Sequence, residues 1–213
     1  MKCYKLTDAD GYTRRGCYNE TLWGEGITHT AMGNGGLCSS GVIHAYSSPE
    51  LALFLNPIHA NIKKPLLWEC EGEILVEDDG AKQGYRTLTT IKRIEYTKPS
   101  RNQSIRFGIL CAKQVFSDST WNEWADKWLD GTDRTANAAY VAYCADSDCA
   151  TYAANAAYDA DCTACYAAVC YAAARAAYCA YADCANKNID LVAIAKQAME
   201  EEAEPPTPSP VLL

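Results

Sequence analysis

The chain has 213 residues, of which 49% are hydrophobic and 22% charged, as is typical of a globular protein with a buried core. This composition excludes wholesale disorder. The net charge of −8 is uneven, because residues 118–204 carry 15 acidic and 5 basic side chains, whereas residues 1–116 carry 12 and 14. Acidic surfaces repel phosphate backbones, so we do not expect the second half to bind nucleic acid directly. It is either a solvated face or a surface that engages a basic partner or mimics nucleic acid.

The first residues do not resemble an export signal, because no apolar segment follows Met1-Lys2. No apolar run approaches the roughly 18 residues that span a bilayer. We therefore expect a cytoplasmic protein without membrane contact. The reducing cytosol argues against a disulfide framework, although the chain has 12 cysteines.

Residues 1–98 predict a mixed α+β head domain. A helix is expected at Glu50–Leu55, with Ser47 or Ser48 as its N-cap and Pro49 at its first position. Asn56-Pro57 is expected to end this helix, because proline disfavours a helical residue before it. Runs of β-branched and aromatic residues predict strands at Cys3–Thr7, Val42–Tyr46, Leu66–Leu75 and Tyr85–Tyr96.

Residues 103–203 predict an all-helical region, since no glycine follows Gly131 and no proline lies between Pro99 and Pro205. A helix is expected from Gln103, and another at Ser119–Leu129 with three tryptophans on one buried face. Residues 204–213 predict a proline-rich tail, either disordered or a short recognition peptide.

Residues 132–185 contain 22 alanines, 8 tyrosines and 7 cysteines, and alanine has the best helix propensity. We expect Thr132-Asp133 to cap this segment, with breaks near Asp146-Ser147-Asp148 and Asp159-Ala160-Asp161. Packed helices are favoured over one long rod, because the small-residue stripe of a rod would stay in water. The stripe must pack against its own neighbours or another copy, so we expect a homo-oligomer.

Two groups of side chains could carry chemistry in the head domain. His29 and His44 could lie on adjacent strands and share a pocket, although a single histidine in a strand is more often structural. Glu69, Glu71 and Glu73 alternate along a predicted strand and so share one face. That face is either turned to solvent, or one of its glutamates serves a cleft in catalysis or ligand binding.

Cys162 and Cys165 form the one C-x-x-C motif of the chain. Zinc would need two further ligands, and no histidine follows His59. Facing helices could still assemble a four-cysteine site. We favour small-residue packing and expect no metal and no cofactor.

The head domain resembles a small domain of unknown function that is common in bacteriophage and bacterial genomes. The resemblance covers residues 1–96 and implies a phage or mobile-element origin. Its pattern is roughly Leu-Cys-x-x-Gly-x-His-Ala, with a proline within a few residues. The residues that carry it are Leu37-Cys38-Ser39-Ser40-Gly41-Val42-Ile43-His44-Ala45, Ser48-Pro49, the segments Leu66–Gly72 and Leu88–Ile94, the opening Tyr4-Lys5 and the turn near Gly16.

The same region more faintly resembles the ADP-ribosyltransferase core. That resemblance implies a nicotinamide pocket lined by His29, His44 and Tyr46, with Glu71 or Glu73 as the catalytic acid. The first hypothesis is nevertheless a non-enzymatic interaction or scaffold protein that binds a host or viral partner. The alternative is an ADP-ribosyltransferase-like enzyme or nucleotide-binding protein.

Overall fold

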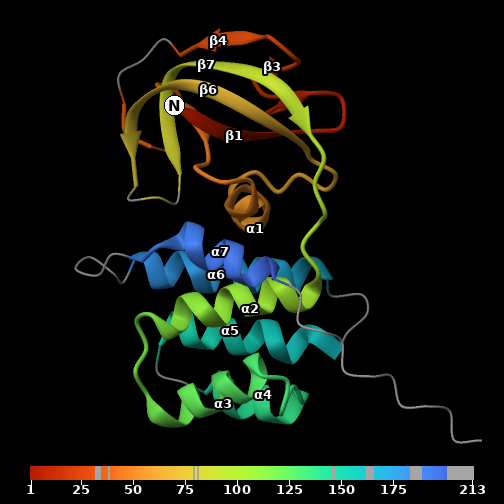
Figure 1. The fold of residues 1–213 in the computed structure, drawn as a ribbon, viewed down its shortest axis with the longest axis vertical. Coiled ribbons are helices and arrows are strands. Elements are labelled where there is room, and N and C mark those ends of the chain that lie inside the picture. Colours follow the sequence, from red (N-terminus) through yellow and green to blue (C-terminus); the bar gives the residue numbers. More distant parts are fainter. Residues whose placement is uncertain are drawn as a thin grey trace, which may run out of the picture.

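The computed structural model of the chain describes residues 1–31, 35–37, 39–78, 80, 82–144, 147–161, 166–182 and 189–200. An antiparallel sheet lies above a stack of helices, which confirms the predicted α+β class (Figure 1). The strands are β1 (Lys2–Thr7), β2 (Tyr12–Thr13), β3 (Thr21–Leu22), β4 (Thr28–Thr30), β5 (Ile43–Ala45), β6 (Leu66–Glu77) and β7 (Gln83–Ile94). The helices are α1 (Pro49–His59), α2 (Arg101–Lys113), α3 (Ser119–Leu129), α4 (Ala136–Tyr143), α5 (Asp148–Tyr158), the 3-10 helix η1 (Asp159–Asp161), α6 (Tyr166–Ala182) and α7 (Leu191–Met199).

The sheet closes on itself into a small barrel. Strands β1, β6 and β7 are antiparallel neighbours, and β4 and β5 both pair with the other edge of β7. Just beyond β5, the backbone N–H and C=O of Tyr46 each form a 2.8 Å hydrogen bond with Tyr4 of β1. This bridge joins β5 to the first strand, and we call the closed unit the barrel.

The two faces of β1 serve two different cores. Cys3, Lys5 and Thr7 alternate along the strand, are buried, and point into the barrel. Leu6 points the other way and joins the core that the helices share. Most of the barrel interior consists of large or polarisable side chains: Cys3, Trp23, Ala45, Trp68, Cys70, Tyr85 and Leu88.

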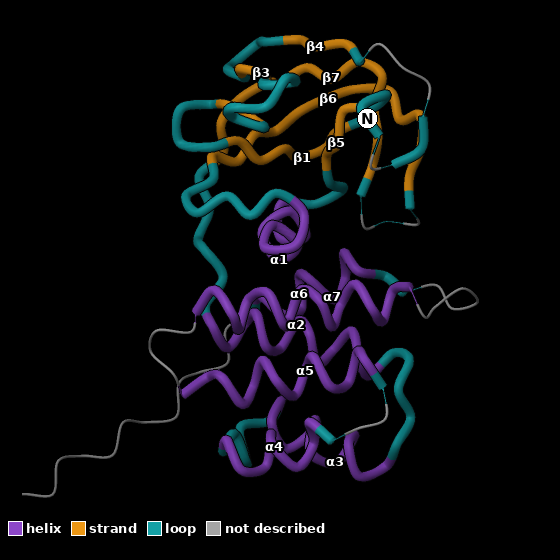
Figure 2. Tube along the Cα trace, turned by 180° about the vertical axis from the view of Figure 1, so that it is seen from behind, coloured by secondary structure: helices purple, strands orange, loops and turns teal. Residues whose placement is uncertain are grey.

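Helix α1 lies between the barrel and the other helices (Figure 2). Ser48 is its N-cap and accepts a 3.1 Å hydrogen bond from the Leu51 N–H, with Pro49 in the first turn, as predicted. The predicted end at Asn56-Pro57 is wrong, because the helix continues through Pro57 to His59. Its last turn is held by tertiary contacts: Ile58 packs on the helical core, and the Asn56 side chain exchanges two hydrogen bonds with the backbone of Ile62.

The alanine-rich segment forms packed helices and not one rod, which confirms the favoured interpretation. Helix α6 packs against α2 and α5, and α5 packs against α4. The predicted breaks are present, since Ser147 precedes α5 and Asp159 begins η1, whereas the first cap is Thr135 and not Thr132-Asp133. Helices α5 and α6 bury most of their described alanines inside the chain.

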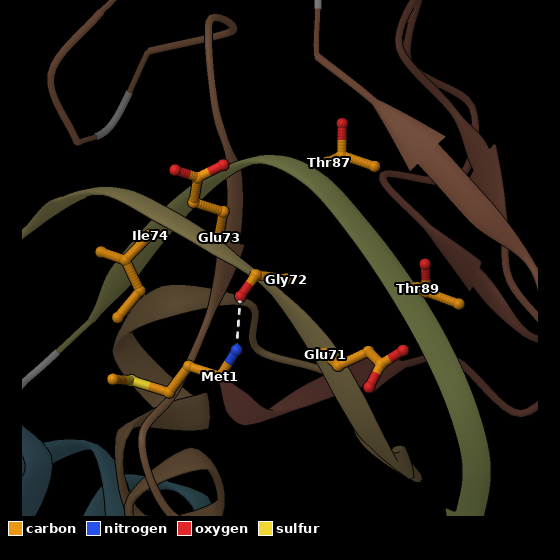
Figure 3. A pocket seen from close by; sticks show the side chains of 7 residues that line it. All are labelled: Met1, Glu71, Gly72, Glu73, Ile74, Thr87 and Thr89. Carbon is orange, nitrogen blue, oxygen red and sulfur yellow. Dashed lines mark hydrogen bonds between the residues drawn. The ribbon is translucent and has the colours of Figure 1, made fainter.

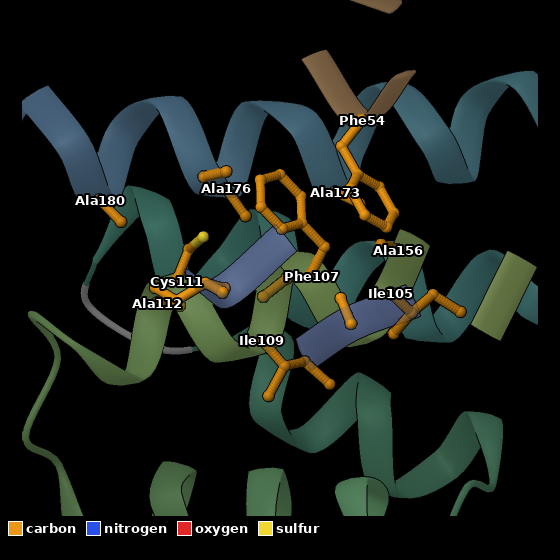
Figure 4. Close-up of a cluster of buried hydrophobic side chains, with 14 of the residues drawn as sticks. Phe54, Ile105, Phe107, Ile109, Cys111, Ala112, Ala156, Ala173, Ala176 and Ala180 are labelled. Carbon is orange, nitrogen blue, oxygen red and sulfur yellow. The ribbon is translucent and has the colours of Figure 1, made fainter. Parts of the chain in front are cut away.

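Small residues let two helix backbones approach closely. A Cβ placed on Gly108 of α2 would lie 3.1 Å from the Cα and 3.2 Å from the carbonyl oxygen of Ala173 in α6. Beside this crossing, the rings of Phe54 from α1 and Phe107 from α2 stack with centroids 4.5 Å apart (Figure 4). The contact connects the head to the helical region through one core.

The predicted division at residues 98 and 103 falls at the start of α2, which begins at Arg101. Helix α3 has the predicted bounds, and its three tryptophans are buried as expected. Cys162, Cys165 and residues 201–213 lie outside the described residues, so the predictions made for them stay predictions.

Candidate functional site

The structure places His44 and Tyr46 on the outer side of the barrel, where it meets α1. Ile43 and Ala45 pack in or against the barrel interior, so the residues that alternate with them point outward. The Tyr46 hydroxyl lies 3.1 Å from Nδ1 of His59 at the end of α1, and the two rings stack with centroids 5.8 Å apart. His59 is thus a member of this group that the sequence did not single out.

The histidines of this group are neutral near pH 7. Burial, followed by the positive charges of Lys82, Lys5 and Arg14, lowers the pKa of His44 to about 4. Burial and the charge of Lys82 lower the pKa of His59 to about 4. Since an efficient general base has a pKa near the working pH, these side chains are poorly suited to that role.

Burial also raises the pKa of the Tyr46 hydroxyl well above its usual range. The hydroxyl therefore keeps its proton and can form a hydrogen bond with the His59 ring. This neutral pair fixes the end of α1 against the strand that closes the barrel.

His29 lies elsewhere, on β4, and points to the same side as Leu88 of the barrel interior. Its ring packs edge-on against Trp23 with centroids 4.6 Å apart, and its Nε2–H donates a 2.7 Å hydrogen bond to the Leu22 carbonyl. These contacts are structural. His29 and His44 face opposite sides of the sheet and do not share a pocket.

Glu71 and Glu73 line a shallow hollow of about 570 Å³ on the outer face of the sheet (Figure 3). The other residues that line it are Met1, Gly72, Ile74, Thr87 and Thr89. The N-terminal amine of Met1 donates a 2.7 Å hydrogen bond to the Gly72 carbonyl across its floor. The hollow contains no histidine, so the nicotinamide pocket implied by the resemblance is not assembled here.

The third residue of the acidic row, Glu69, is an ion-pair partner. Its carboxylate lies 2.9 Å from Nζ of Lys2 and 4.0 Å from Nζ of Lys92, which come from the two neighbouring strands. The hydrogen bond from Lys2 lowers the pKa of Glu69. The row thus combines one ion-paired glutamate with two that line the hollow, and both interpretations offered by the sequence stay open.

Lys5 is a buried lysine that the sequence interpretation missed. It is 7% exposed, donates a 2.9 Å hydrogen bond to the His44 carbonyl, and its Nζ lies 4.6 Å from the centre of the Trp23 ring. Burial lowers its pKa to about 8, against the opposing effect of Cys70 and Cys3. The available signal was its position, since Lys5 alternates with Cys3 and Thr7 on the inward side of the first strand.

The helical region carries exposed aromatic side chains. Tyr140, Val141 and Tyr143 of α4 and Tyr158 at the end of α5 are 43–69% exposed. The Tyr140 and Tyr158 rings lie 5.9 Å apart and join the two helices at the surface. We call these four residues the tyrosine patch.

Within the described part of the chain, no group of three or more His, Cys, Asp or Glu side chains is arranged to hold a metal ion. No helix in that part combines the length and apolar character needed to cross a membrane. Comparison with models of protein families, with curated proteins and with solved structures finds no match to this chain. The resemblances noted for the head domain therefore stay predictions.

Proposed function

We propose that the chain is a non-enzymatic interaction protein whose helical region binds a basic segment of a partner protein. The observation that carries the proposal is the tyrosine patch, which leaves large apolar side chains in water although the alanines around them are buried. Exposed groups of this kind commonly mark binding surfaces, and tyrosine is enriched among residues that contribute most to binding.

The charge around the patch favours a cationic partner. Residues 136–144 and 147–161, the described segments that hold α4 and α5, carry three aspartates and no lysine or arginine. An acidic surface attracts basic side chains and repels phosphate groups. The partner expected here is therefore a lysine- or arginine-rich protein segment.

Tyrosine rings can also hold cations directly, and the chain does so with its own side chains. The Arg175 guanidinium lies 5.3 Å from the centre of the Tyr152 ring, Lys98 Nζ lies 3.7 Å from that of Tyr166, and the Arg15 guanidinium lies 4.4 Å from that of Tyr12. Such a contact contributes about 0.5–1 kcal/mol at an exposed site. The exposed tyrosine rings of the patch could bind a cation of a partner in the same way.

The alanine faces support the aromatic patch as the binding surface. From the sequence, the alanine faces could pack against a neighbouring helix or against another copy of the chain. In the structure, α5 and α6 bury most of their described alanines inside the same chain. An alanine seam between copies is thus not needed to cover them. Self-association would have to use another surface.

Binding can be tested with a fluorescein-labelled peptide of alternating arginine and glycine, followed by anisotropy at physiological salt. We expect the double variant Tyr140→Ser/Tyr158→Ser to bind about tenfold more weakly than the unchanged protein, because two ring contacts are lost. The matched control is Tyr18→Ser, since Tyr18 is a 92% exposed tyrosine of the head domain.

Equal affinity of the double variant and the unchanged protein would contradict the proposal, as would equal binding of a glutamate-containing peptide. Light scattering on the same samples measures the molar mass and so tests whether a second copy of the chain occupies the tyrosine patch. If the unchanged protein has the mass of a dimer and the double variant that of a monomer, the patch binds a second copy of the chain and the proposed basic partner is contradicted.

A further inference from the structure

Two cysteines face each other inside the barrel. Cys3 of β1 and Cys70 of β6 are register partners, and both are buried. Two residues along, Met1 and Gly72 exchange both of their backbone hydrogen bonds, at 2.7 and 3.2 Å. Since hydrogen-bonded pairs recur every second residue, Cys3 and Cys70 form such a pair, with Cα atoms about 5.5 Å apart. This spacing lies in the middle of the range that a disulfide spans.

We propose that Cys3 and Cys70 are a redox-active dithiol that low-molecular-weight disulfides, such as oxidised glutathione, convert to a disulfide. This site is independent of the tyrosine patch and of the proposed binding function. The two side chains project from directly opposite positions on adjacent strands into the same interior, so the bond requires side-chain rotation and a small approach of the two strands.

The reaction balances in two exchanges. The Cys3 thiolate attacks one sulfur of the small disulfide, whose S–S bond breaks and releases a first thiolate, which takes up a proton. Cys70 then loses its proton and attacks the Cys3 sulfur of the mixed disulfide, which releases a second small thiol. The two protein thiols are oxidised, and one small disulfide is reduced to two thiols.

The surroundings assign the two cysteines different roles. The Cys70 thiol, the Tyr85 hydroxyl and the Lys5 ammonium together lower the pKa of Cys3, although burial opposes them. The hydrogen bond that Cys70 makes with Cys3 raises the pKa of Cys70, and burial raises it further. Thiolate is the attacking form, so Cys3 is the nucleophile and Cys70 the resolving thiol.

Access to the buried pair requires a local opening of the barrel, and the short contact between β1 and β5 is where we expect it. Two backbone hydrogen bonds between Tyr4 and Tyr46 and the bond from Lys5 to the His44 carbonyl hold β1 to β5. Each is a single contact along a short edge, and short edges open far more often than whole domains unfold. We therefore expect slow oxidation of the native protein, without unfolding of the helices.

The experiment incubates the native, full-length protein in oxidised and reduced glutathione at several ratios. Free thiols are then blocked, and peptides are mapped by mass spectrometry without reduction. We expect the peptides of Cys3 and Cys70 to be linked, with the loss of two hydrogens. The matched control is Cys111→Ser, which changes a buried cysteine of α2 and should leave this link intact.

Two further variants test the order of attack. Cys70→Ser should trap glutathione on Cys3, because the resolving thiol is missing. Cys3→Ser should carry about tenfold less glutathione on Cys70, since that thiol has a raised pKa. Comparable adducts on both variants would overturn the assigned roles.

Absence of the Cys3–Cys70 link at equilibrium with oxidised glutathione would overturn the proposal itself. A link that forms only in urea, together with other cysteine pairs, would do the same. Both outcomes are read on the unchanged protein, so poor folding of a variant cannot conceal them.

Discussion

The barrel and the helical region solve the problem of filling an interior in opposite ways. The barrel is filled by large side chains with polar ends, and each end has a partner: Trp68 Nε1 donates to Thr7 Oγ1 at 3.0 Å, and the Tyr85 hydroxyl donates to Gln83 Oε1 at 2.7 Å. The helical region is filled largely by alanine, which has no polar end to satisfy. The first strategy depends on hydrogen bonds made by individual residues, and the second on the distance between helix axes.

The difference has a consequence for what each region tolerates. Large polar-ended side chains fix one arrangement of strands, because an unpaired buried polar group costs about 1–3 kcal/mol. Alanine faces contribute little area per residue, so they depend on close backbone approach over a long contact. We therefore expect the helical region to be sensitive to added volume and the barrel to be sensitive to altered charge.

The largest expected effect is on the crossing of α2 and α6. Gly108→Leu should lower the free energy of unfolding by about 3 kcal/mol, because the new side chain meets the backbone of Ala173, which cannot move aside as a side chain can. Urea unfolding followed by circular dichroism measures the change. Gly36→Ala is the control, since a Cβ there meets no atom within 4 Å. Equal stability of Gly108→Leu and the unchanged protein would show that the helices are not closely packed.

A smaller effect, and one that depends on pH, is expected from Lys5 in the barrel. Its folded-state pKa of about 8 lies below the usual 10.5, so the unfolded chain binds more protons between these values and stability rises with pH there. Lys5→Met removes this group while keeping a side chain of similar length. Between pH 8 and pH 10, the free energy of unfolding should rise by about 1–3 kcal/mol more in the unchanged protein than in Lys5→Met. A constant difference across this range would mean that burial does not lower the pKa of Lys5.

The smallest effect is expected where the two regions meet. The folded-state pKa values of His44 and His59 are about 4 against a usual 6.5, so the unfolded chain binds more protons between pH 6.5 and 4. Stability should be fully present above pH 6.5 and fall as the pH drops toward 4. We expect about 1–2 kcal/mol for each histidine, because both are partly exposed.

The measurement is urea unfolding at pH 7.0 and 4.5. His59→Gln should lose less stability between these two values than the unchanged protein does. His29→Gln serves as the comparison, since His29 lies on β4, away from the contact between barrel and helices. The same loss in His59→Gln and the unchanged protein would argue against a buried neutral His59.

Much of the architecture could be predicted from local patterns. The turn at Asp130-Gly131 predicted the end of α3 and the tryptophan spacing predicted its buried face. Packed helices were favoured over a rod because the small-residue stripe of a rod would stay in water. The failure at Pro57 has a local cause, because proline removes one hydrogen bond, and packing of the last turn of α1 outweighed that loss.

The candidate site was less predictable, because its residues come from segments far apart in the chain. His44 and Glu71 were chosen by residue type and Tyr46 by the resemblance, but alternation in the sheet and the closure of the barrel placed the glutamates in a hollow without histidines. Lys5 was passed over because a single lysine in a strand normally reaches solvent. Its alternation with Cys3 and Thr7 pointed inward, and the structure shows its Nζ over the Trp23 ring and bonded to the His44 carbonyl.

By itself, the sequence determined the places of four of the strands, the change from strands to helices near residue 100 and the need of the alanine faces for cover, because these follow from propensity and periodicity within a few turns of chain. The short strands β2, β3 and β4 were not predicted. Tertiary structure alone decided that the cover comes from the same chain, that β5 closes the sheet onto β1, and that Cys3 meets Cys70. These outcomes depend on which distant segments pair, and the free energy of such contacts is set by shape and burial that no local pattern records.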